Sequence, residues 1–426
     1  MRIALRATDP GRHDVWAFAA AMGFALATYA SVVNLFPFLG PLRPALSTAA
    51  AAAVLLVAGR VSRGAGFTWD GARGLTIVAL GLWTFLSAGW SYSPAMSRYT
   101  GVEMLKLIAI YLTLVNLVNT PRRLTLIAGA AVVASLAPSV GTFDFWRRGV
   151  DLVDGYRAHW LGVYLDPNHL AMSLVAIVPV AIFFAITRRP LAMRLAAGAA
   201  AVSGVAAIIV SHSRGGALGL ALALGLWSLT GPKKLRAMVM AALVLLGAAI
   251  FAPKSFWSRT ETITEYGVDI SAQGRVWAWQ VTAAINQDRP LTGVGAGAFV
   301  TAWPDYARGD ARRARFVAHN IFLAELGELG FVGFFLFLAF VSGALAGAAR
   351  SWKEPRVGPL AHAITAGFAG YILCDMLSGY VLSAHFFFLT ALCAAAERCA
   401  RVHPSTSSGC RVDEATAPAR AEAAAS

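Results

Sequence analysis

The stretch NHLAMSLVAIVPVAIFFAIT, residues 168–187, contains no Asp, Glu, Lys or Arg and is apolar along most of its length. A helix needs about 20 such residues to cross the roughly 30 Å hydrocarbon core of a bilayer. A membrane-spanning strand would instead alternate apolar and polar residues, which this stretch does not do. It therefore predicts a membrane-spanning helix.

The rest of the 426-residue chain has the same character. Hydrophobic residues make up 58% of it and charged residues only 14%, whereas soluble domains are about 25% charged. This composition excludes an ordinary water-soluble domain. We predict an all-α polytopic membrane protein whose membrane domain covers residues 1–401. About twelve spans fit the hydropathy, near residues 15–36, 44–59, 74–90, 102–118, 124–141, 168–187, 191–211, 214–230, 235–252, 320–349, 358–380 and 384–400.

The net charge of +14 has a topological explanation. On a soluble chain this excess would suggest nucleic acid, but short cytoplasmic loops of membrane proteins also collect Lys and Arg. Basic clusters fall in alternate connectors, at residues 60–73, 122–123, 188–194, 233–236 and 350–356. The short connectors on the opposite side contain few basic residues. We predict cytoplasmic termini, contact with membrane lipids and no nucleic-acid partner. The arginines before the first span resemble the start of a signal peptide, but the apolar stretch is too long for one and the sequence after it stays hydrophobic, so we predict an uncleaved anchor.

Two predicted outer loops do not follow the charge pattern. The loops at 142–167 and 253–318 carry several arginines, among them Arg147 and Arg315. They are either solvated loops of ordinary charge or an anion-binding surface. The tail at 402–426 is rich in Ala, Ser and Pro, which predicts disorder on the cytoplasmic side.

The segment SHSRGG, residues 211–216, lies at the predicted outer junction of two spans. Gly215 and Gly216 permit a tight turn and the close approach of a ligand to the backbone. The first N–H groups of the following helix favour an anion, and the guanidinium of Arg214 suits phosphate. Together with Ser213 these residues predict a phosphate site. The alternative is a plain hairpin in which Arg214 reaches lipid headgroups.

The segment GRVWAWQVTAAINQDRP, residues 274–290, has apolar residues at helical spacing. It predicts an amphipathic helix on the membrane surface with Arg275 at its start. The apolar face would hold Val276, Trp279, Ala283 and Ile285. The glycine-rich stretch at 293–297 follows no strand, so we predict a flexible turn there and no nucleotide site.

The segment HNIFLAELGELG, residues 319–330, enters the long span at 320–349 from the predicted outer side. His319 would be neutral at pH 7 if its pKa is ordinary, and could then accept a proton. Glu325 would face a polar cavity or a charged partner inside the membrane. The alternatives are a helix cap at His319 and Asn320 and a paired structural glutamate.

The segment DPNH, residues 166–169, precedes the span at 168–187. Proline and asparagine there are typical of a helix start. Asn168 could instead hydrogen-bond a sugar hydroxyl.

These motifs, in this order, resemble the O-antigen ligase and O-antigen polymerase superfamily. The likeness rests on the Ser213–Gly216 turn, the Gly274-Arg275-Val276-Trp277 helix start followed by PLTGVG, and the 319–330 entry, and covers about residues 205–335. It implies transfer of a glycan from undecaprenyl diphosphate at the periplasmic face of the bacterial inner membrane, without a metal or other cofactor. The resemblance assigns Arg214 and Arg275 to the diphosphate and His319 to the general base.

The chemistry agrees with this resemblance. The leaving diphosphate needs cations, and the sequence contains neither a D-x-D motif nor a close cluster of His, Asp and Cys at metal-ligand spacing. Arginines on the outer side would then stabilise it. The substrate-binding candidates are Asn168, Ser213, Gly215, Asn320, Glu325, Arg147 and Arg315.

The sequence leaves the acceptor open. A ligase would use the lipid A core of lipopolysaccharide, a polymerase another lipid-linked glycan, and a related transferase a protein hydroxyl. A transporter or flippase of lipid-linked saccharide is the alternative from another class, although such proteins tend to show repeat symmetry, and we see no internal repeat.

Overall fold

The computed structural model describes residues 12–230, 238, 242, 270–380 and 382–402. These residues are almost wholly helical and contain no strand, only one isolated bridge between Val153 and Arg157. The all-α prediction is confirmed. Within these described residues, seven helices are long and apolar enough to cross a membrane, and the count of about twelve stays a prediction. Most of the predicted span at 235–252 and the tail at 403–426 lie outside the described residues.

Most of the described helices overlap the predicted ranges. In chain order they are α1 (Arg12–Tyr29), α2 (Val32–Leu35), η1 (Pro37–Leu42), α3 (Pro44–Ser62), α4 (Gly71–Leu86), η2 (Ser87–Gly89), α5 (Pro94–Leu117), α6 (Pro121–Ala134), α7 (Leu136–Arg148), η3 (Gly162–Tyr164), α8 (Pro167–Ile186), α9 (Leu191–Val210), α10 (Arg214–Thr230), α13 (Ile270–Asp288), α14 (Phe299–Tyr306), η5 (Gly309–Arg313), α15 (Ile321–Arg350), α16 (Gly358–Asp375) and α17 (Ala384–Val402).

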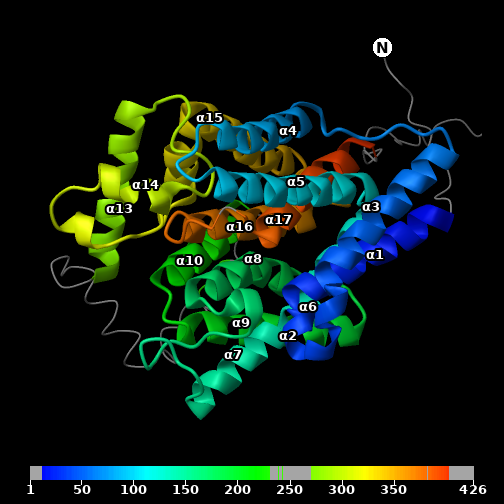
Figure 1. The fold of residues 1–426 in the computed structure, drawn as a ribbon. Coiled ribbons are helices and arrows are strands. Elements are labelled where there is room, and N and C mark those ends of the chain that lie inside the picture. The colour runs from blue at the N-terminus through cyan, green and yellow to red at the C-terminus, as the bar shows by residue number, and fades with distance from the viewer. Residues whose placement is uncertain (1–11, 231–237, 239–241, 243–269, 381, 403–426) are drawn as a thin grey trace, which may run out of the picture.

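Helix α8 forms the centre of the bundle. It packs against α9, α10 and α16, and 83% of its most apolar window is buried, whereas the corresponding value for residues 37–62 is 22%. A helix that is apolar on every face is stabilised by neighbours on every face. Figure 1 shows α4, α5 and α15 side by side, with α13 and α14 together at one end of these helices.

Several predicted boundaries were wrong. Helix α5 begins at Pro94, eight residues before the predicted start at 102. The range 15–36 is divided because α1 ends at Tyr29 and Ser31 adopts a left-handed conformation with φ of 47°. The predicted outer loop at 142–167 begins with helix, because α7 continues to Arg148 and ends at Gly149 with φ of 64°. The connector is therefore shorter than the sequence suggested.

The predicted outer segment at 253–318 contains helices, as expected, within its described part from residue 270 onward. Helices α13 and α14 share a small core that includes Val281, Ile285 and Trp303. The predicted apolar face of α13 needs correction, because Val276 and Trp279 are exposed at 40% and 43% while Ile285 is buried. Ala278 and Val281 complete the buried face.

Helix α15 is broken at Gly330, where φ is 67° and ψ is −168°. The break removes the usual i to i−4 hydrogen bonds, so the carbonyls one turn earlier need other donors. The N–H of Val294 donates to Gly327 O (3.0 Å) and that of Gly295 to Glu328 O (2.8 Å). The indole N–H of Trp83 donates to Leu329 O (3.0 Å).

The glycine-rich turn is therefore part of the core of this end of the bundle. It also supplies Pro290 O, which accepts a hydrogen bond from the N–H of Phe331 (2.7 Å), and Ala296 N–H donates to Ser87 Oγ (3.0 Å). A Cβ at Gly330 would lie 2.3 Å from the carbonyl carbon of Leu291. The prediction of a flexible turn is corrected, because the turn completes a broken helix.

Candidate functional site

The candidate residues gather around the short loop between α16 and α17, residues 376–380, which we call the α16–α17 loop. A Cβ at Gly215 would lie 3.4 Å from Leu377 Cδ1, so the start of α10 contacts this loop. A Cβ at Gly379, whose φ is +75°, would lie 3.0 Å from His319 Cα and 2.7 Å from Asn320 N. The loop therefore joins the Ser213–Gly216 turn to the entry of α15.

His319 is half-buried and adopts the left-handed conformation with φ of 50°. Burial lowers the pKa of its imidazole, the positive charge of Arg275 lowers that pKa further, and the Asp166 carboxylate opposes both effects. The charges of Arg275 and Asp166 therefore act on the ring from two other parts of the chain. A neutral imidazole at pH 7 is able to accept a proton.

Arg275 lies in the second turn of α13 and is half-buried. The residue before it, Gly274, packs closely against Phe316. A Cβ at position 274 would lie 2.9 Å from Phe316 Cε1, so only glycine permits this contact. The Phe316 ring also contacts the His319 ring, with centroids 6.2 Å apart. Gly274 and Phe316 thus place the start of α13 against the segment that carries His319.

Asn168 lies at the centre of a polar cluster on the first turn of α8. Its Oδ1 accepts hydrogen bonds from Arg157 (3.0 Å) and from Ser213 Oγ (2.9 Å). Asp166 caps the helix through Asn168 N (2.6 Å), which confirms the predicted helix start. The cluster fixes Ser213 beside α8, and contact of Asn168 or Ser213 with a sugar stays a prediction.

Arg214 is the first residue of α10, as the sequence predicted for the helix after the SHSR turn. The carbonyl of the next residue, Gly215, accepts a hydrogen bond from the Cys374 thiol (3.1 Å). The start of α10 is therefore held against the end of α16. The role of Arg214 in binding an anion stays a prediction.

Asn320 caps α15, which confirms the structural alternative for this residue. Its Oδ1 accepts hydrogen bonds from the N–H groups of Phe322 (2.9 Å) and Leu323 (3.2 Å). One turn further, Glu325 is 4% exposed, and its Oε2 lacks a hydrogen-bond partner among the described residues. Glu325 and Glu328 line a cavity of about 240 Å³ that also reaches Gly379.

A larger cavity of about 550 Å³ also adjoins the α16–α17 loop. Its lining includes Tyr99, Lys106, His169 and Tyr380. The rings of His169 and Tyr380 stack with centroids 4.5 Å apart. Tyr380 borders both cavities and contributes an aromatic surface to each.

Two candidates are largely exposed, away from these buried contacts. Arg147 is 69% exposed on the last turn of α7, where it forms an ion pair with Asp144 of the same helix (3.3 Å). Arg315 is exposed in the segment before His319. Their proposed contact with substrate stays a prediction.

The sequence reasoning missed three residues that organise the site. Arg157 belongs to the predicted loop at 142–167 and was not singled out, yet it is 7% exposed and donates to Asn168 and to Ser211 O (3.3 Å). Gly379 and Tyr380 carried no motif. The described residues contain no group of three or more His, Cys, Asp or Glu positioned to hold a metal ion.

The apolar helices and their arrangement define the class, a multi-pass helical membrane protein. A family model described as "O-Antigen ligase" matches residues 199–338, a range that contains Arg214, Arg275 and His319. The chain is also 27% identical over 267 residues to the "Exopolysaccharide production protein ExoQ" of Rhizobium meliloti (strain 1021). That match covers 58% of this chain and 59% of the relative, so the chain matches less than two thirds of that protein's length. The predicted resemblance to the O-antigen ligase and polymerase superfamily is confirmed.

Gly379→Ala is expected to displace His319. The left-handed conformation costs a residue with a Cβ about 1–2 kcal/mol, and the new methyl group would also overlap the backbone of His319 and Asn320. Thermal unfolding measures the loss of stability, and the glycan transfer that the sequence resemblance implies, taken per folded molecule, measures the displacement of His319. Gly149→Ala is the matched control, because its φ is +64° and nothing lies within 4 Å of its Cβ position. Equal transfer by both variants would contradict the positioning role.

Proposed function

We propose that this protein transfers a glycan from a lipid diphosphate carrier, such as undecaprenyl diphosphate, to an acceptor hydroxyl. The observation that carries the proposal is His319, whose half-buried imidazole experiences the charge of Arg275 within a segment that matches an O-antigen ligase model. A neutral base beside a fixed cation suits a reaction in which a hydroxyl attacks and an anion leaves.

In the proposed reaction, His319 accepts the proton of the acceptor hydroxyl. The acceptor oxygen forms a bond to the anomeric carbon of the donor sugar while the bond from that carbon to the diphosphate oxygen breaks. The lipid diphosphate leaves with the bonding electron pair. Arg214 and Arg275 stabilise its developing charge, because guanidinium groups bind phosphate oxygens through paired N–H donors.

The name of the relative favours a polysaccharide as the acceptor. ExoQ is named for exopolysaccharide production, which suits a polymerase that extends another lipid-linked glycan. A ligase acting on the lipid A core and a transferase acting on protein hydroxyls use the same donor chemistry. We place the reaction at the periplasmic face of the inner membrane, on the side predicted from the loop charges.

Deletion of the gene tests the proposal through the lipid-linked intermediates that accumulate. Long free lipid-linked chains with bare acceptor would indicate a ligase, and single repeat units would indicate a polymerase. Restoration by the wild type but not by His319→Asn would support catalysis over transport, since a transporter has no need of this base. Unchanged lipid carriers after deletion would contradict the proposal.

The pH dependence of transfer should report the pKa of His319. The pKa of His319 is lowered, so the imidazole stays neutral at pH values below the ordinary pKa of histidine. Activity should therefore fall at a lower pH than it would with an unperturbed histidine. Arg275→Gln removes a charge that disfavours the imidazolium, which raises the pKa and moves this acid limb to higher pH. Asp166→Asn removes a charge that favours the imidazolium, so it moves the limb to lower pH.

These two variants control for each other in a kcat/KM profile. Asparagine is also a good N-cap, so the Asp166 variant keeps the start of α8. Shifts in the same direction, or no shift in either variant, would exclude His319 as the titrating base.

A further inference from the structure

A third cavity, of about 660 Å³, lies at the other ends of the helices that carry the candidate site. It is lined by the start of α4, the end of α15 and the end of α17. The cavity beside Glu325 adjoins the opposite ends of α4 and α15, at Thr84 and Leu329. Helix α5 runs from the cavity beside Glu325 to this third cavity, and its 24 residues span about 36 Å. We call this third cavity the α4–α17 pocket.

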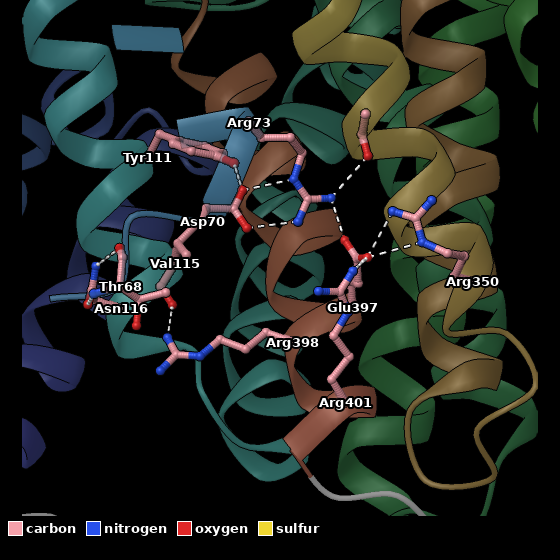
Figure 2. Close-up of polar contacts among 11 residues, drawn as sticks. Thr68, Asp70, Arg73, Tyr111, Val115, Asn116, Arg350, Glu397, Arg398 and Arg401 are labelled. Atoms are coloured by element: carbon pink, nitrogen blue, oxygen red, sulfur yellow. Dashed lines mark hydrogen bonds and ion pairs between the residues drawn. The ribbon is translucent and has the colours of Figure 1, made fainter. Parts of the chain in front are cut away.

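The inner wall of the α4–α17 pocket is a network of ion pairs and hydrogen bonds centred on Arg73 (Figure 2). Arg73 forms ion pairs with Asp70 (2.8 Å) and with Glu397 (2.6 Å). The Tyr111 hydroxyl donates to Asp70, and Arg73 also donates to Gly343 O (3.0 Å). Glu397 has a side-chain exposure of only 4%. This layer holds α4, α5, α15 and α17 together.

The lining of the α4–α17 pocket as a whole has more positive than negative charge. The lining contains four arginines, at 73, 350, 398 and 401, against the two carboxylates of Asp70 and Glu397, which is a formal excess of +2. Arg350 (2.9 Å) and Arg401 share Glu397 Oε1. Arg398 donates to a neutral acceptor, Val115 O (2.8 Å).

The exposed arginines retain donors for a ligand. The side chains of Arg350 and Arg401 are 60% and 70% exposed, and a guanidinium carries five N–H donors. Residues 71–73 at the start of α4 line the same cavity, and a helix N-terminus favours negative charge. A phosphate could bind Arg350 and Arg401 while Arg73 keeps both of its carboxylates.

We infer that the α4–α17 pocket binds a phosphate group, carried by the headgroup of an anionic phospholipid. Basic pockets between membrane-spanning helices are typical binding sites for such headgroups. Trp69, which lines the pocket, is 63% exposed, as suits an indole at the headgroup level of a bilayer. The arginines here are part of a binding site as well as markers of topology.

The test compares lipids on the detergent-purified full-length protein. Dioleoylphosphatidylglycerol should raise the Tm of the wild type more than dioleoylphosphatidylcholine does. Arg350→Gln/Arg401→Gln should need about tenfold more phosphatidylglycerol for half of the effect, because two charge-assisted donors are lost. Arg122→Gln/Arg188→Gln removes the same charge from exposed positions outside the pocket, at the start of α6 and in the connector after α8. This variant should respond like the wild type.

Three further outcomes are decisive. If inorganic phosphate alone raises the Tm with the same dependence on Arg350 and Arg401, the phosphate site stands and its ligand is free phosphate. Equal lipid responses of the pocket variant and the wild type would overturn the inference. Native mass spectrometry of the wild type provides a readout if the variant does not fold, and equal retention of both lipids there would also overturn it. None of these readouts depends on glycan transfer.

Discussion

His319→Asn is expected to lower glycan transfer by about 10²–10⁴-fold, the usual effect of removing a general base. Asparagine is a better replacement than alanine because residue 319 has φ of 50°, a conformation that asparagine tolerates well. The variant therefore keeps the backbone that Gly379 contacts and removes only the imidazole.

The measurement is the initial rate of transfer from a purified lipid-diphosphate-linked glycan, per folded molecule. His362→Asn is the matched control, since His362 packs on Trp352 (ring centroids 4.6 Å apart) outside the site proposed here. It should keep the wild-type rate. Full activity of His319→Asn would exclude this residue as the base.

Arg275→Gln is expected to reduce transfer by about 10²–10³-fold, as does removal of one donor to a developing negative charge. Glutamine is shorter and neutral, so the diphosphate loses a cation at the point where charge accumulates. The loss should fall mainly on kcat, because the interaction strengthens in the transition state.

Arg275→Lys separates the two contributions of this side chain. Lysine keeps the positive charge and hence the acid limb set by His319, but lacks the planar paired donors of arginine. We expect its rate to lie between those of the wild type and Arg275→Gln. Arg308→Gln, at an exposed position in the same segment, should transfer normally. A kcat for Arg275→Gln equal to that of the wild type would exclude Arg275 as the group that stabilises the leaving diphosphate.

Much of the helical architecture follows from local hydropathy. The stretch at 168–187 is apolar on all faces and became α8, the most enclosed of the candidate spans. Its start was also predictable, because Asp166, Pro167 and Asn168 are typical of a capped helix, and Asp166 does cap it. Hydropathy and helix capping depend on residues that are adjacent in the sequence, so both can be predicted from the sequence alone.

The break in α15 was not predictable in the same way. Residues 321–350 have the composition of one continuous helix, and glycine alone does not break a helix. The break persists because the turn at 290–297 and Trp83 satisfy the carbonyls that it leaves open. That compensation comes from residues distant in the chain, which no local pattern records.

By itself, the sequence determined the helical class, most helix positions, and the order of the motifs that carry Arg214, Arg275 and His319. Tertiary structure decided which of these residues share a site, because the α16–α17 loop contacts both the Ser213–Gly216 turn and His319. It also buried Arg157 beside Asn168 and gathered Arg350, Arg398 and Arg401 around one cavity. Hydropathy is a property of each segment, whereas the environment of a charge depends on every segment that packs around it.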